Sequence, residues 1–264
     1  MLFRLIIINL FILSGFFSLA EEVKGSKKIV IEESVVSFKP TYTYEYSVGP
    51  NQTPYTLSRG MFKIDFIVYS QGSVLLKLYV GLWEFLTVGI VEDIQGIIGN
   101  SPITMNIPLA SMKLNIINEM NSFSLSVAID SFSYGLPGRA FSPDYYSKTL
   151  YGVHLPMSIR YKSVFNSYSD LVFGAKFPIL PVGDVNVINT ALFLSTYVKF
   201  SEVFTISFGV DNLFLSSERI TNSSVFSEFK FSPTRSLGLS LILNYSFLPS
   251  FERIIKIEYI GNLF

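Results

Sequence analysis

From residue 61 to the C-terminus, the chain repeats one pattern of hydrophobic and polar positions. Apolar side chains alternate with small or polar ones over about ten residues, and a turn follows. Residues 123–130 show it clearly, because Phe, Leu, Val and Ile alternate there with Ser, Ser, Ala and Asp. Residues 204–211 and 237–247 repeat the alternation. A period of two residues predicts strands that have one apolar face and one polar face.

Twelve segments carry this pattern, and turn residues separate them. We expect strands at 61–69, 74–82, 86–93, 107–117, 122–132, 150–162, 169–178, 185–198, 203–213, 224–232, 236–247 and 252–263. The polar faces carry charges in strand after strand, which a dry sandwich core would not accommodate. The pattern therefore predicts an all-β fold, a transmembrane antiparallel up-and-down β-barrel with lipid outside and water inside.

The lengths of the connections support this count. On one side of the expected barrel all connections are short, and on the other side lie the long ones, 94–106, 133–149 and 214–223 among them. Bacterial outer-membrane barrels have an even number of strands, short periplasmic turns and longer outer loops. Twelve strands place both ends of the barrel on the short-turn side, and fourteen remain the alternative if 28–47 forms a hairpin.

Differences in sequence pattern divide the chain into three parts. Residues 1–20 have the features of a cleaved signal peptide: Arg4, an apolar run over 5–17, and the small residues Ser18 and Ala20 before the expected cleavage site. Residues 21–60 lack the barrel pattern and are expected to form a periplasmic extension, a plug in the lumen, or two more strands. Residues 61–264 form the expected barrel, which the signal peptide and the barrel pattern together place in the bacterial outer membrane.

Composition agrees with a membrane barrel. Hydrophobic residues make up 49% and aromatic residues 16%, whereas charged residues make up only 15%, below the usual quarter. An outer apolar band with aromatic girdles accounts for this excess. The expected partners are membrane lipid, including a lipopolysaccharide-like outer leaflet, and the barrel-assembly machinery. A net charge of zero gives no indication of nucleic-acid binding.

The inward face is fixed by its charges, because a Lys or Arg on the lipid face costs roughly 2–4 kcal/mol near the midplane. We expect these residues to line the lumen: Lys63, Asp65, Lys77, Lys113, Asp130, His154, Arg160, Lys162, Lys176, Lys199, Glu228, Lys230, Lys256 and Glu258. Their basic excess suggests a weakly anion-preferring lumen. The alternative is a network of cross-strand ion pairs that fills the interior and keeps it neutral.

The residues of the chain give little support for catalysis or for cofactor binding. His154 is the single histidine and the chain has no cysteine, so a histidine-based or thiolate metal site is excluded. Ser158 shares the inward face of its strand, but four residues along a strand span about 13 Å, too far for a nucleophilic pair. We expect no catalytic residue, no metal and no cofactor.

The longest expected outer loop, 133–149, is rich in Gly, Pro and Tyr. Its large and charged side chains are the expected contact residues for an external partner: Tyr134, Arg139, Tyr145 and Tyr146.

Two resemblances extend this interpretation. The chain ends on Phe264, similar to bacterial outer-membrane barrels whose last strand is read by the insertion machinery, although Phe264 lies out of phase with Tyr259. Residues 53–93 resemble the opening of the YjbH-type barrels: Thr53-Pro54 and 55–60, then 71–73, 80–82 and 86–90. That family is linked to exopolysaccharide secretion, which implies a pore or export conduit for small solutes or glycans. The alternative function is a closed barrel that serves as a surface scaffold or adhesin through its outer loops.

Overall fold

The computed structural model describes residues 45–69, 72–98, 102–120, 122–134, 148–162, 168–179, 190–214, 223–246 and 250–263. The predicted signal peptide, 1–20, and residues 21–44 lie outside this part of the chain, so the predicted division into three parts stays a prediction. Within the described residues, no helix has both the length and the apolar character that a membrane crossing needs.

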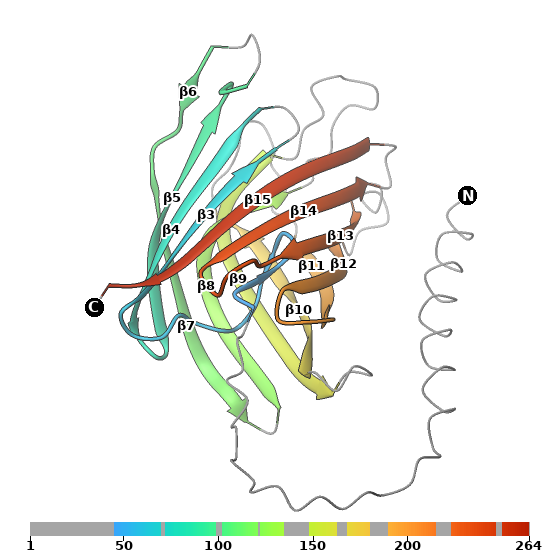
Figure 1. Ribbon diagram of the computed structural model, residues 1–264. Coiled ribbons are helices and arrows are strands. Elements are labelled where there is room, and N and C mark those ends of the chain that lie inside the picture. Colours follow the sequence, from blue (N-terminus) through green and yellow to red (C-terminus); the bar gives the residue numbers. More distant parts are fainter. Residues whose placement is uncertain are drawn as a thin grey trace, which may run out of the picture.

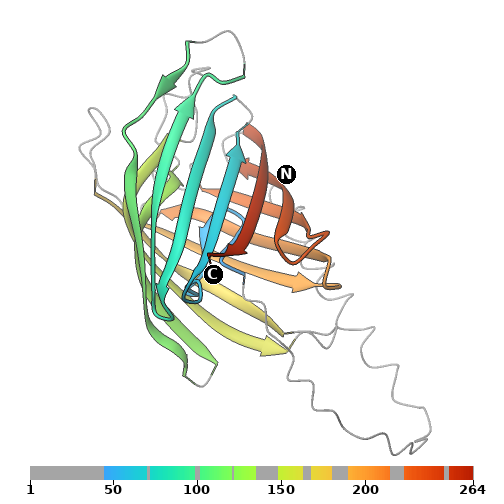
Figure 2. The same cartoon turned by 60° about the vertical axis from the view of Figure 1, so that its left-hand side comes forward.

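Twelve antiparallel strands form a closed ring, as the sequence predicted (Figure 1). Their bounds are β3 (Met61–Val68), β4 (Val74–Trp83), β5 (Leu86–Gln95), β7 (Leu109–Met120), β8 (Phe123–Tyr134), β9 (Lys148–Lys162), β10 (Tyr168–Pro178), β11 (Ala191–Lys199), β12 (Phe204–Phe214), β13 (Ser224–Phe231), β14 (Leu237–Ser246) and β15 (Ser250–Asn262). Each strand pairs with its neighbours in the chain except where β3 meets β15, and that pairing closes the ring (Figure 2). Closure leaves every ring strand with two partners, so the barrel has no open edge.

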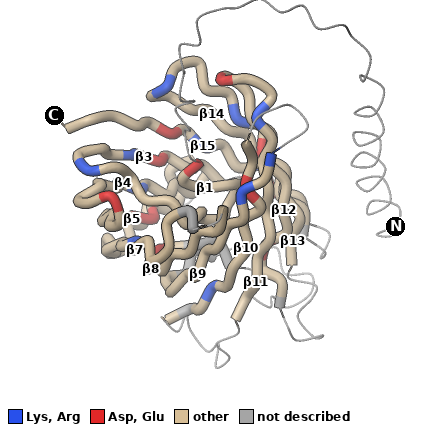
Figure 3. Tube along the Cα trace, turned by 90° about the horizontal axis from the view of Figure 1, so that it is seen from below, with Lys and Arg blue, Asp and Glu red and all other residues tan. Residues whose placement is uncertain are grey.

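Three short strands lie outside this ring. β6 (Thr104–Met105) pairs with the end of β5, beyond the ring itself. β1 (Ser47–Val48) and β2 (Asn51–Gln52) pair only with each other and form a separate hairpin. This hairpin lies inside the ring of strands when the barrel is viewed from below (Figure 3).

The two ends of the barrel differ as the sequence predicted. Segments 84–85, 121–122, 163–167, 200–203 and 232–236 connect the strands at one end, which we call the short-turn end. Segments 69–73, 96–108, 135–147, 179–190, 215–223 and 247–249 connect them at the other, which we call the long-loop end. β3 begins and β15 ends at the short-turn end.

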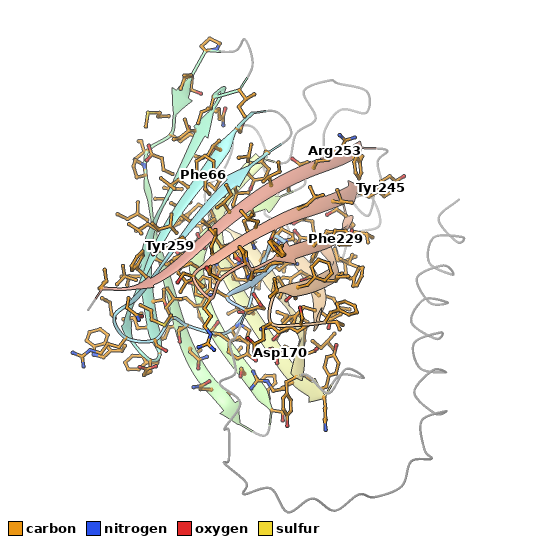
Figure 4. The ribbon with its side chains drawn as sticks, viewed as in Figure 1. Phe66, Asp170, Phe229, Tyr245, Arg253 and Tyr259 are labelled. Carbon is orange, nitrogen blue, oxygen red and sulfur yellow. The ribbon has the colours of Figure 1, made fainter. Side chains whose placement is uncertain are left out.

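The outer surface is apolar, with aromatic residues gathered near the short-turn end. Exposed aromatic side chains there are Trp83, Phe85, Tyr161, Tyr168, Phe200, Phe204, Phe231 and Tyr259. Phe66 and Phe229 are also exposed on the outer face, each two residues before the end of its strand (Figure 4). Arg253 lies toward the long-loop end, its guanidinium 5.4 Å from the ring centre of Phe251. An apolar belt with an aromatic border is typical of barrels whose outer face contacts lipid.

Candidate functional site

The inward face carries the charges that the alternation predicted. Ten of the fourteen expected lumen residues are at most 8% exposed: Lys63, Asp65, Lys77, Lys113, Asp130, His154, Lys176, Glu228, Lys256 and Glu258. Arg160, Lys199 and Lys230 are half-buried, while Lys162 is exposed at the short-turn end of β9. The buried charges are thus enclosed by protein atoms in this state, rather than bordered by an open water-filled channel.

One wall of the lumen holds a continuous chain of ion pairs across β3, β15 and β13. Lys63 Nζ lies 2.8 Å from Asp65 and 3.0 Å from Glu258. Glu258 also forms ion pairs with Lys230, whose Nζ lies 2.6 Å away, and with Lys256, whose Nζ lies 3.2 Å away. Asp65 and Glu258 stand directly opposite each other in the strand register. Like charges in that position repel, so the lysines between them make the arrangement possible.

Two further carboxylates, on β8 and β10, are paired with tyrosines as well as with basic side chains. Asp130 accepts from the Tyr79 hydroxyl at 2.6 Å and lies 3.4 Å from Lys77 Nζ. Asp170 accepts from Tyr197 at 2.7 Å and pairs with Arg160 at 3.1 Å.

Asp170 was not among the predicted lumen residues, although it is fully buried. The signal was present in the sequence, because Asp170 lies in phase with Lys176 on the same strand. Lys176 itself pairs with Asp211 from β12.

Ser158 faces the interior of the barrel and contacts the N-terminal part of the chain. Its hydroxyl lies 3.2 Å from the phenol of Tyr55, a residue of the N-terminal segment. His154 is 1% exposed and lies on the same face of β9. In the part of the chain that the structure describes, no three His, Cys, Asp or Glu side chains gather in a way that could hold a metal ion.

Residues 45–58, which we call the inner segment, occupy the lumen. Their hairpin turns at Gly49, where φ is +57°, a conformation that favours glycine. A Cβ built there would lie 2.1 Å from the ring of Phe226, so a side chain would collide with the barrel wall. The Gly49 N–H also donates to the Glu228 carboxylate at 2.7 Å. Both the turn conformation and the close approach therefore require glycine at this position.

The apolar contacts of the inner segment lie on two walls. Val48 is fully buried in a cluster with Val172, Phe193 and Phe226. On the other side, the ring of Tyr46 packs against Tyr79 with 5.1 Å between the ring centres.

Hydrogen bonds attach the returning half of the inner segment to the barrel. Gln52 donates to Asp130. The Asn115 amide donates to the Pro54 carbonyl at 2.8 Å, and the Leu57 N–H donates to the Thr87 hydroxyl at 2.9 Å.

Glu45 begins the inner segment with a carboxylate held between two lysines. Its oxygens lie 3.2 Å from Lys199 Nζ and 2.7 Å from Lys230 Nζ. Burial alone would raise the pKa of this carboxyl, but the two ammonium groups lower the pKa to about 2. Glu45 is therefore ionised at neutral pH and serves as a counter-ion to the barrel wall.

Lys113 depends on the inner segment for its contacts. It is 1% exposed, and its ammonium group donates to the Tyr55 carbonyl at 3.2 Å. The same group lies 3.4 Å from the centre of the Tyr46 ring, a close cation–π contact. Within the described ranges, Lys113 makes no ion pair with a carboxylate. A buried ammonium is costly without such partners, so the inner segment stabilises this wall.

The predicted outer-loop residues can be followed only in part. Tyr134 ends β8, while Arg139, Tyr145 and Tyr146 lie outside the described residues. Their role as contact residues stays a prediction.

Comparisons with known proteins name no family for this chain. No family model matches the chain, and no curated protein matches it. Among solved structures, the NanC porin has a TM-score of 0.43 at 11% identity, covering 76% of this chain and 98% of that one. The COG4313 outer membrane channel from Pseudomonas putida F1 has a TM-score of 0.46 at 10% identity, covering 78% of this chain and 97% of that one. The barrel assignment rests on the strand pairing itself, and the YjbH-type resemblance stays a prediction.

Proposed function

We propose that the protein is a bacterial outer-membrane β-barrel pore for small solutes and that the inner segment closes it in the state described above. The observation that carries this proposal is the closed ring of twelve strands with an apolar outer face and charges on its inner face. Such a ring satisfies its backbone hydrogen bonds without water, which a lipid bilayer requires. The inner face then surrounds a polar path from one end of the barrel to the other.

The inner segment supports the closed state through the kind of contact it makes. It is attached to the barrel by hydrogen bonds, ion pairs and side-chain packing, while the strands of its hairpin pair only with each other. These contacts are separate from the ladder of the ring, so their loss would leave every ring strand paired. Withdrawal of the inner segment is the movement that would open the lumen.

A closed scaffold or adhesin is the second candidate. The low exposure of the interior charges favours it, because a barrel that never opens needs only a filled and neutral interior. We also propose glycans as transported solutes and the barrel-assembly machinery as a partner. The support for both is the resemblance of the sequence to bacterial outer-membrane barrels.

Planar-bilayer recording of the full chain separates these candidates. We expect mostly closed traces interrupted by uniform conductance steps, because the inner segment is held by non-covalent contacts that break and re-form. Folding is verified by the shift in gel mobility on heating. If the folded, inserted protein gives no steps across many insertions, then the pore proposal is wrong and the scaffold stands.

A further inference from the structure

The site of Glu45 is a carboxylate-binding site that the chain fills with its own residue. Lys199 comes from β11 and Lys230 from β13, and their ammonium groups converge on one carboxylate at 3.2 and 2.7 Å. Both lysines are half-buried at the short-turn end. When the inner segment leaves, Lys199 loses this contact, whereas Lys230 keeps Glu258 at 2.6 Å.

Three further basic residues donate to oxygen atoms of the same segment. Lys113 donates to the Tyr55 carbonyl at 3.2 Å, the Arg160 guanidinium donates to the Tyr55 hydroxyl at 3.0 Å, and Lys256 donates to the Ser47 hydroxyl at 3.1 Å. The inner segment thus presents acceptor oxygens to basic side chains along its path, at Glu45, at Ser47 and twice at Tyr55. These are the contacts that an anionic solute would make at the same donors.

Withdrawal of the inner segment leaves the interior of the barrel with more positive charge, which favours the binding of anions. Seven basic side chains of the barrel take part in the contacts of this region: Lys63, Lys77, Lys113, Arg160, Lys199, Lys230 and Lys256. Five barrel carboxylates oppose them: Asp65, Asp130, Asp170, Glu228 and Glu258. Glu45 is a sixth carboxylate that belongs to the inner segment, so its departure raises the basic excess from one to two.

From this geometry we infer that the open lumen takes anionic solutes that bear carboxylates, which replace the Glu45 carboxylate and the Tyr55 oxygens at Lys199, Lys230, Lys113 and Arg160. The inference rests on the proposed pore and deepens it, since it names the class of solute and its binding groups. It also makes the inner segment an internal competitor of that solute. A ligand that replaces a bound segment shifts the population toward the state it binds.

The first test is ion selectivity, measured on the full chain with Glu45→Gln. In a tenfold KCl gradient across a planar bilayer, we expect the reversal potential to show chloride preferred over potassium by at least about twofold. Adding Lys199→Gln is expected to bring the ratio close to one. Arg235→Gln, which removes an exposed basic residue from the turn between β13 and β14 at the same end, is the matched control and should leave the ratio unchanged.

The outcomes of this test separate the two proposals. Conducting steps that prefer potassium, or equal effects of Lys199→Gln and Arg235→Gln, would overturn the anion inference and leave the pore in place. Absence of steps in all variants would overturn the pore, and the second test then decides whether anions displace the inner segment.

The second test uses the absence of cysteine from the natural chain. Asn51 is fully buried in the hairpin, and its amide has no hydrogen-bond partner among the described residues. Asn51→Cys therefore removes no described bond and reports when the hairpin leaves the lumen. We expect citrate to raise the labelling rate by a neutral maleimide at least about threefold over sodium chloride of equal ionic strength, because citrate competes for the lysines.

Two comparisons make the labelling result decisive. Sucrose should leave the rate unchanged, and Lys199→Gln combined with Lys230→Gln should abolish the effect of citrate. Equal rates in citrate and chloride would contradict the inference, whether or not the protein conducts.

Discussion

Replacing Glu45 with lysine is expected to open the barrel. The change puts a third ammonium group where Lys199 and Lys230 now share one carboxylate at 3.2 and 2.7 Å. Breaking a fully buried ion pair costs about 3–5 kcal/mol. The side chains here are 13–21% exposed, which lowers that cost, while the new repulsion between ammonium groups adds to it. Even half of the lower figure would change the ratio of open to closed molecules about tenfold. Planar-bilayer recording should therefore show an open fraction at least about tenfold above that of the natural chain.

The matched control is Glu202→Lys. Glu202 lies exposed in the turn between β11 and β12, at the same end of the barrel, so the replacement makes the same change in charge outside the lumen. We expect its open fraction to match that of the natural chain. Equal open fractions in the Glu45 and Glu202 variants would show that Glu45 does not hold the lumen closed.

Replacing Leu241 with lysine is expected to destabilise the folded barrel by roughly 2–4 kcal/mol in a bilayer. Leu241 lies in the middle of β14 between Phe229 and Ile255, and its side chain is 42% exposed on the outer face. A lysine there would have to leave its charge in hydrocarbon or distort the strand to reach the interface. Urea unfolding in lipid vesicles, followed by the fluorescence of the single tryptophan, measures the loss.

The Leu241→Lys variant tests how the cost of a charge depends on depth in the membrane. Its control is therefore the same replacement at a position near the interface. Leu263 is 54% exposed just beyond the end of β15, at the short-turn end. Leu263→Lys should cost only about 0–1 kcal/mol, because charges near the interface are tolerated. Comparable losses for the two lysines would argue against a bilayer around the barrel.

Much of the fold could be predicted because strand patterns are local. The expected strand 61–69 became Met61–Val68, and 224–232 became Ser224–Phe231. Alternation fixes which face each residue takes, and turn residues fix where a strand ends. The even count and the division between short and long connections then led to twelve strands, which the structure confirms.

The partners of the interior charges could not be predicted in the same way. Lys77 stands directly opposite Asp65 on β3, yet its ion pair is with Asp130 on β8, three strands away around the ring. Side chains that point into a narrow barrel meet across it as well as along its wall. The strand register expected from the sequence identifies only the pairs of residues on adjacent strands.

The position of the inner segment was the least predictable part of the fold, since a plug in the lumen was only one of three alternatives for residues 21–60. Its strands are only two residues long, so they carry no periodic signal, and Gly49 and Pro50 read as a break in the chain. Its contacts also join residues far apart, such as Glu45 and Lys230, which are 185 positions apart. Such contacts depend on the closed ring, which has to exist before the segment has a surface to bind.

The most direct test of the central claim, that the inner segment closes the lumen, is to tether it reversibly and record conductance. The Tyr55 hydroxyl lies 3.2 Å from that of Ser158 on the barrel wall, and the natural chain has no cysteine. With Tyr55→Cys and Ser158→Cys, a short bis-methanethiosulfonate cross-linker that spans about the length of a tyrosine side chain would join segment and wall through a reducible disulfide at each cysteine. We predict that the cross-linked protein shows no conductance steps and that reduction restores them. Steps that persist at the same frequency while the cross-link is intact would contradict the account.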